Sequence, residues 1–167
     1  MSARAVKFFL LFLAQAALWN YCNFTPYLMI ALLPTMLLCL PVERSTITVM
    51  LIAFVAGIAV DFLVTGQLGL TSFALVPVAV FRRRMIRIVF GQELFARGEN
   101  LSFSRQGWQK IFWAVVLQNA LFLLLYIWVD DAGTRSFGYD ALKFVISLVA
   151  SSFVGLLVSS LMLDESA

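Results

Sequence analysis

Asp61 is the residue of this sequence best placed to do chemistry, because it is the one acidic residue that we expect inside an apolar segment. An ionisable group in a membrane-crossing helix is costly and generally faces protein or water rather than lipid. Ala53 and Gly57 precede it at intervals of four, so a strip of small residues leads along one helix face to the carboxylate. Asp61 therefore marks either a pocket or partner contact, or a structural position satisfied by water or by the N–H groups of the turn at 65–69.

The sequence lacks the residues that most catalytic mechanisms require. There is no histidine, which excludes His-based triads, HExxH metal sites and His proton relays. Catalysis by two carboxylates would need a second acid within the apolar segments. Asp130, Asp131 and Asp140 cluster beyond one such segment and could hold a cation, but acidic loops are usually just solvated. We therefore expect no catalytic residue, no metal and no cofactor.

The composition explains why so few chemical groups are present. Hydrophobic residues make up 62% of the 167 residues and charged residues 13%, whereas average globular chains have about 45 to 50% apolar and about 25% charged residues. Too few charges remain to cover a soluble domain, so lipid must contact most of the surface. The net charge of +3 is concentrated beside apolar segments, where anionic lipid headgroups account for it without nucleic acid.

Apolar segments follow one another along the chain with little between them. We expect a single domain over residues 1–167, an all-α membrane protein that forms a compact bundle of about six transmembrane helices. The second span is expected to be a helix kinked at Pro34, and the fourth is short for a bilayer. The expected spans cover residues 6–23, 26–41, 46–64, 69–82, 108–129 and 141–163.

The one sizeable hydrophilic segment covers residues 82–110 and opens with four arginines, Arg82, Arg83, Arg84 and Arg87. The apolar residues between them predict an interfacial helix. With the N-terminus in the cytoplasm, ten of the 12 basic residues fall on the cytoplasmic side, so both ends of the chain are expected there. The arginines then either anchor this topology on anionic lipid or dock a cytoplasmic protein.

A second strip of small residues lies in the last span, where four residues repeat at intervals of four: Ser147, Ser151, Gly155 and Ser159. Small residues let helices approach closely in lipid, so this face is expected to pack against a helix of this chain or of a partner. The first and fifth spans also contain polar residues, Gln15, Asn20, Gln118 and Asn119. We interpret them as hydrogen bonded between helices, with a polar lumen as the alternative.

Two further stretches are Asn23-Phe24-Thr25-Pro26-Tyr27-Leu28-Met29-Ile30, and Gly57-Ile58-Ala59-Val60-Asp61 followed by Gly66-Gln67-Leu68-Gly69-Leu70. In these stretches the sequence resembles the MreD family of bacterial rod-shape-determining proteins, particularly its Bacteroidetes members. The order of spans, the chain length and the basic segment before the fifth span agree as well, whereas the last third matches mainly in hydropathy. The family-motif positions are Gly57, Asp61, Gly66 and Gly69, with Pro26 and Tyr27 as weaker ones.

The resemblance implies a non-enzymatic subunit of the bacterial inner membrane, part of the cell-elongation machinery that supports rod shape and lateral cell-wall synthesis. Its implied partners are a bitopic MreC-like protein and, directly or through the larger assembly, MreB and the wall-synthesis enzymes. It also implies a fold similar to the S-components of ECF transporters, so a small-molecule-binding transporter subunit is the alternative function. The candidate partner or ligand contacts are Ala53, Gly57, Asp61, Gly66 and Gly69.

Overall fold

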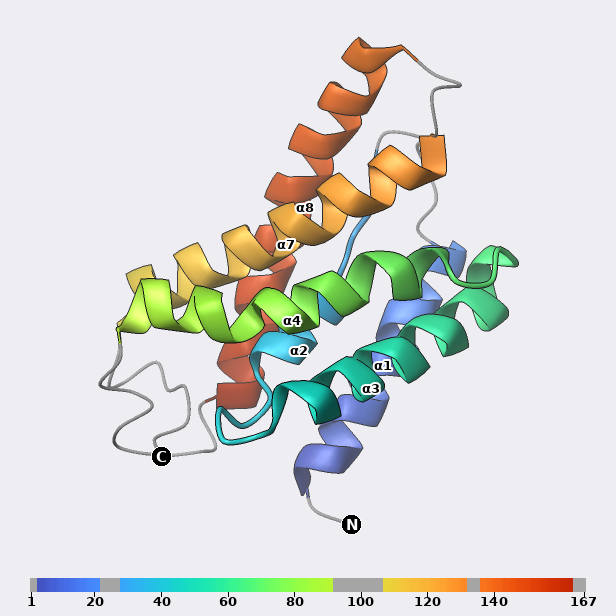
Figure 1. Ribbon diagram of the computed structural model, residues 1–167. Helices are drawn as coiled ribbons and strands as arrows, with labels where there is room; N and C mark the ends of the chain where they lie inside the picture. The colour runs from blue at the N-terminus through green and yellow to red at the C-terminus, as the bar shows by residue number, and fades with distance from the viewer. Residues whose placement is uncertain (1–2, 22–27, 92–106, 132–135, 164–167) are drawn as a thin grey trace.

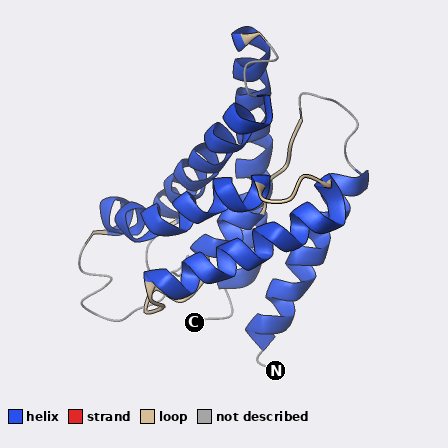
Figure 2. Cartoon of the chain, turned by 45° about the vertical axis from the view of Figure 1, so that its right-hand side comes forward, coloured by secondary structure: helices blue, strands red, loops and turns tan. Residues whose placement is uncertain are grey.

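The computed structural model describes residues 3–21, 28–91, 107–131 and 136–163, and these residues form helices with no strand among them (Figures 1 and 2). The all-helical prediction is thus confirmed. Three helices are long and apolar enough to cross a membrane, which indicates a membrane protein: Thr46–Val64, Trp108–Asp131 and Phe137–Leu163. The elements are α1 (Ala3–Tyr21), α2 (Leu33–Leu38), α3 (Thr46–Val60), the π-helix η1 (Asp61–Thr65), α4 (Leu70–Phe90), α7 (Trp108–Asp131) and α8 (Phe137–Leu163).

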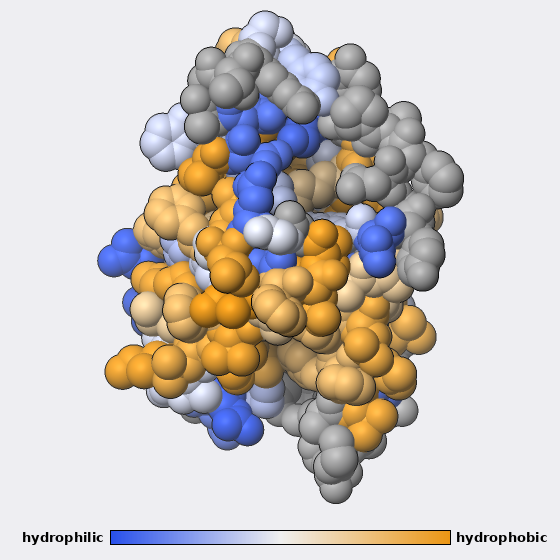
Figure 3. Space-filling model, turned by 90° about the vertical axis from the view of Figure 1, so that its right-hand side faces the viewer, coloured by the Kyte–Doolittle hydropathy of each residue, from blue (hydrophilic) through white to orange (hydrophobic). Residues whose placement is uncertain are grey.

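The short helix α2 lies at the centre of the bundle. It contacts α1, α4, α7 and α8, and all six of its residues are buried. Around it, α4 packs between α3 and α7, and α8 packs on α7 (Figure 1). Apolar side chains cover most of the middle of the face shown in Figure 3, as expected where lipid is the solvent.

The helices alternate in direction between two ends of the bundle. In Figure 1, α1, α3 and α7 run toward the end that holds η1, and α4 and α8 run back. The end that holds η1 is the η1 end. The opposite end holds the start of α1 and the last turn of α4, and we call it the basic end because it carries Lys7, Arg44, Arg83, Arg84, Arg87 and Lys110.

The second expected span, over 26–41, is not a continuous helix where the structure describes it. Residues 28–32 are non-helical, and α2 begins only at Leu33. Pro34 lies in the first turn of α2, where its missing N–H removes no helical hydrogen bond. Pro34 therefore starts a helix here instead of bending one, and a stretch of unwound backbone precedes it.

Side chains of α8 provide hydrogen-bond partners for part of this unwound backbone. Ser147 Oγ accepts the N–H of Met29 at 3.0 Å. Ser151 Oγ accepts the N–H of Ala31 at 2.9 Å and donates to the carbonyl of Met29 at 3.2 Å. The two serines at the start of the small-residue strip thus hold a segment about 120 residues earlier in the chain.

Side chains of α1 provide the other partners. The amide of Gln15 donates to the carbonyl of Ile30 at 3.1 Å, and its oxygen accepts the N–H of Leu32 at 2.5 Å. The indole N–H of Trp19 also donates to Ile30. Non-helical backbone at membrane depth is tolerated only where protein or a water-filled cavity satisfies its polar groups. The bonds from α1 and α8 meet that requirement for the N–H groups of Met29, Ala31 and Leu32 and for the carbonyls of Met29 and Ile30.

The third span covers the residues expected for it and joins α4 by a tight turn. Ser45 caps the start of α3, since its Oγ accepts the N–H of Thr48 at 3.2 Å. The last turn of this span is the π-helix η1, which ends at Gly66 in the left-handed region, at φ 68°. α4 begins four residues later, so the turn holds α3 and α4 antiparallel.

α4 covers the fourth expected span and extends beyond it. α4 runs from Leu70 to Phe90 without interruption, past Pro77 and through the arginines, and its 21 residues extend about 30 Å. The structure thus departs from the expectation of a short span ending at residue 82 followed by a separate interfacial helix. No proline or glycine occurs between Pro77 and Gly91, so nothing in the sequence ends the helix before Gly91, where φ is 84°.

Candidate functional site

Asp61 is fully buried and forms the first residue of η1. One carboxylate oxygen accepts the N–H of Gly69 at 2.8 Å, and both accept the N–H of Thr71 at 3.1 Å. The first N–H groups of a helix lack helical partners and favour a negative charge. The carboxylate therefore caps the start of α4 from the neighbouring helix. This geometry agrees with the interpretation of Asp61 as a structural residue bonded to backbone N–H groups.

The two motif glycines of the turn adopt backbone conformations that other residues rarely adopt. Gly66 has φ of 68° and Gly69 has φ of 101°. The N–H of Gly66 donates to the carbonyl of Asp61 at 2.8 Å and closes the π-helix. Gly66 is exposed and Gly69 is half-buried, so this turn forms the accessible part of the candidate contact.

Ala53 and Gly57 lie on the face of α3 that packs against α4, and both are buried. A Cβ atom on Gly57 would lie 2.5 Å from Ser72 Oγ and 2.6 Å from Ser72 Cα. Ser72 Oγ in turn donates to the carbonyl of Phe54 at 3.0 Å. The small residues before Asp61 therefore let α3 and α4 of this chain approach closely. Because α4 covers Ala53 and Gly57, these two residues are not accessible to a partner.

An apolar groove runs along the outer side of the α3–α4 contact. Its larger part has a volume of about 710 Å³, and a smaller part of about 250 Å³ shares Phe54 and Val76 with it. Together they extend from Ile47, at the start of α3, to Leu68 beyond η1. Because the described walls are almost entirely apolar, the groove suits lipid tails or an apolar helix.

Arg82 is buried, unlike the other arginines of the cluster. It is 1% exposed, and its guanidinium donates to the carbonyls of Leu38 at 3.2 Å, Leu40, and Pro41 at 3.4 Å. The structure thus departs from the expectation that Arg82 contacts lipid or a cytoplasmic partner. The reason is that carbonyls at the end of α2 lack helical partners, and Arg82 supplies donors for them.

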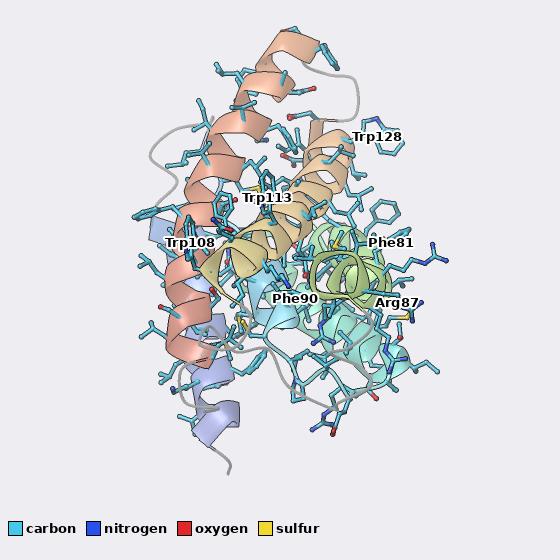
Figure 4. All side chains as sticks on the ribbon, turned by 90° about the vertical axis from the view of Figure 1, so that its left-hand side faces the viewer. Phe81, Arg87, Phe90, Trp108, Trp113 and Trp128 are labelled. Carbon is cyan, nitrogen blue, oxygen red and sulfur yellow. The ribbon has the colours of Figure 1, made fainter. Side chains whose placement is uncertain are left out.

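The remaining arginines of the cluster stay accessible. Arg83, Arg84 and Arg87 are exposed on the last turns of α4. The guanidinium of Arg84 lies 5.8 Å from the ring centre of Phe81, and Arg87 points away from the bundle (Figure 4). These three can contact lipid headgroups or another protein.

Lys143 joins α7 to α8 at the η1 end. Its ammonium lies 3.1 Å from a carboxylate oxygen of Asp130 and 3.3 Å from one of Asp131, and Lys143 and Asp131 are both buried. A lysine thus occupies the acidic corner considered as a cation site, and the described residues contain no group of three or more metal ligands. The sequence signal for this ion pair was the presence of acidic residues at the end of α7 and of a lysine near the start of α8.

The small-residue strip of α8 faces the interior of this chain. Beyond its two serines, a Cβ atom on Gly155 would lie 2.7 Å from Thr35 Oγ1, 2.9 Å from Val115 Cγ1 and 3.3 Å from Asn119 Nδ2. Ser159 is buried and donates to the carbonyl of Leu156 at 2.9 Å. The strip therefore contacts the unwound segment, α2 and α7.

The intramembrane polar residues divide into three groups. Gln15 is hydrogen bonded between helices, as interpreted from the sequence, whereas Asn20 is exposed. Gln118 and Asn119 are fully buried, and their side-chain atoms have no hydrogen-bond partner in the described structure. Thr35 Oγ1, which the sequence did not indicate as a site, is also buried without a hydrogen-bond partner. It lies beside Asn119, near Gly155.

Comparison of the chain with known protein families, with curated proteins and with solved structures finds no match. No relative therefore adds a role for Asp61, for the arginines or for the buried amides. The geometry of the described residues and the two motif stretches carry the functional argument.

Replacing Gly57 with alanine should destabilise the protein, because the new methyl group would press on the backbone of α4 at Ser72. Overpacking of this kind costs about 1–3 kcal/mol. Gly138→Ala is the matched control, since a Cβ there meets no atom within 4 Å, and alanine favours a helix. Thermal unfolding in detergent should show a lower midpoint for G57A alone; equal midpoints would contradict the close contact.

Replacing Arg82 with leucine should also destabilise the protein, because it leaves carbonyls at the end of α2 unpaired, at about 1–3 kcal/mol for each buried group. Arg83→Leu removes the same charge from an exposed neighbour and should have little effect. The same unfolding assay compares the two. Equal losses would show that Arg82 acts through net charge and not through the bonds to Leu38, Leu40 and Pro41.

Proposed function

We propose that this chain is a non-enzymatic scaffold subunit of the bacterial inner membrane, which supports rod shape and lateral wall synthesis by binding a bitopic MreC-like protein. The larger assembly would include MreB and the wall-synthesis enzymes. The observation that carries the proposal is that the buried charged side chains bond to other parts of this chain. Every buried charged residue that the structure describes holds helices together: Asp61, Arg82, Asp131 and Lys143.

The residues that resemble the MreD motif support this proposal. Gly57, Asp61, Gly66 and Gly69 all build the junction of α3, η1 and α4. Their roles are close packing, helix capping and a tight turn, and none of these roles is catalytic. A motif that shapes a helix pair fits a protein whose task is to present a surface.

We place the partner's transmembrane helix in the apolar groove of α3 and α4. The groove extends from the start of α3 to the turn beyond η1, which is nearly the whole length of this span. A lipid tail reaches only the middle of a bilayer, whereas a single helix can follow such a groove from one side to the other. The exposed glycine turn then lies at one end of this contact.

The distribution of charge supports a topology with both chain ends in the cytoplasm. The exposed basic residues of the basic end contrast with Lys143, the one described basic residue of the η1 end, which is paired. Cytoplasmic loops of membrane proteins carry an excess of Lys and Arg. We therefore propose six crossings, by α1, residues 28–38, α3, α4, α7 and α8, with the basic end in the cytoplasm.

Blocking the groove should release the partner. Ile58→Trp would fill the groove, and Val149→Trp would place the same ring on the exposed face of α8. In affinity purification from native membranes with mass spectrometry, we expect an MreC-like single-pass protein with the parent chain and V149W, and its loss with I58W. Cells that depend on I58W should also lose rod shape. Equal recovery with both variants would contradict the groove as the contact.

The alternative is a small-molecule-binding transporter subunit, and one observation favours it. Thr35 and Asn119 bury polar atoms without partners where α2, α7 and α8 meet, and Gln118 of α7 also buries an amide without partners. Such burial is costly unless hydrogen bonds compensate for it, and a small molecule with donors and acceptors would supply them. A small molecule retained in the same purified sample, and lost in Asn119→Leu, would favour this alternative over the scaffold.

A further inference from the structure

A pocket with a polar rim and apolar walls opens at the basic end, between the last turn of α4 and the first turns of α7. Its volume is about 400 Å³. Figure 4 shows Trp108 and Trp113 on these turns of α7. The lining residues are Ile88 and Val89 of α4 and Gln109, Lys110, Trp113 and Leu117 of α7. These residues lie outside the family motif and the arginine cluster.

The lining changes from charged to apolar along α7. Gln109 and Lys110 are exposed in the first turn, Trp113 is 59% exposed one turn later, and Leu117 follows after another turn. Seven residues of helix separate Lys110 from Leu117, which is about 10 Å. Tryptophan is enriched at the level of lipid headgroups, so this order of residues matches the change from headgroups to acyl chains.

We propose that this pocket binds one anionic phospholipid. The phosphate lies against the ammonium of Lys110 and the amide of Gln109, and the start of an acyl chain lies against Trp113, Leu117 and Ile88. None of the described lining residues is acidic, so the site is complementary to a negative charge. A free phosphate would use the rim alone and leave the apolar walls in water, and this favours a lipid as the occupant.

The site differs from the general attraction of the arginines for anionic lipid. Arg83 and Arg84 are exposed, and neither lines this pocket. Each basic residue near a membrane surface adds about 1 kcal/mol of such attraction without selecting a position. The inference rests on the proposed placement of the basic end at the membrane interface, but not on partner binding.

Tryptophan fluorescence tests the site in the full chain. In nanodiscs, Trp108→Phe and Trp128→Phe leave Trp113 and the buried Trp19 as the fluorophores. Phosphatidylglycerol brominated on its acyl chains, as a minor component, should quench Trp113 more than the same amount of brominated phosphatidylcholine. Lys110→Gln should weaken this preference about tenfold through the loss of one charge-assisted hydrogen bond.

Arg83→Gln is the matched control, because it removes the same charge from the same end outside the pocket. It should retain most of the preference. Leu117→Trp, which fills the apolar wall without changing charge, should lower occupancy of labelled lipid as measured by native mass spectrometry, and this variant serves if K110Q does not fold. Equal effects of K110Q and R83Q, no preference for the anionic lipid, or displacement by soluble glycerol phosphate would each overturn the proposal.

A cysteine placed at the exposed Ser45 reports on the topology separately. Labelling from the cytoplasmic side is expected. Labelling from the other side would overturn the proposed topology and the placement of the lipid in the cytoplasmic leaflet. If labelling is cytoplasmic but the preference for anionic lipid is absent, the lipid site alone is overturned.

Discussion

A buried backbone that is not helical must find hydrogen-bond partners elsewhere, and residues 28–32 take theirs from two other helices. Gln15 and Trp19 of α1 bind one part of the segment, and Ser147 and Ser151 of α8 bind another. Arg82 of α4 does the same for the carbonyls that follow α2. The central segment is thus fastened by helices from the beginning, middle and end of the chain. The positions of polar residues in otherwise apolar helices follow from this requirement.

The remaining buried charges complete the same pattern. Asp61 joins α3 to α4, and Lys143 joins α8 to the end of α7. Because these groups are engaged inside the bundle, the described surface offers other molecules its apolar groove, its glycine turn and its basic end. Such a surface suits contacts with helices and lipids. Among the described residues, the unpartnered side chains of Thr35, Gln118 and Asn119 are an interior feature that would suit a ligand.

Hydropathy predicted the helical class and the region of the long apolar helices, because each of these helices has its apolar character along its own length. It failed at residues 28–32, because the backbone conformation there depends on hydrogen bonds from the helices that pack against the segment. Ser147 and Ser151 had the spacing of a packing strip, but their partner is unwound backbone, and nothing within α8 reveals that. Arg82 was grouped with its exposed neighbours for the same reason. The amide of Gln15 and the proline at position 34 were the available sequence signals, and only the two together predict an unwound segment with a side-chain partner.

The conformation of the segment before α2 tests this account most directly. Solid-state NMR of the labelled protein in lipid bilayers gives the ¹³Cα chemical shifts of residues 28–38. We expect non-helical shifts from Leu28 to Ala31 and helical shifts from Leu33 to Leu38. Helical shifts that continue unbroken from Leu28 would show an ordinary transmembrane helix and would contradict the role assigned to Gln15, Ser147 and Ser151.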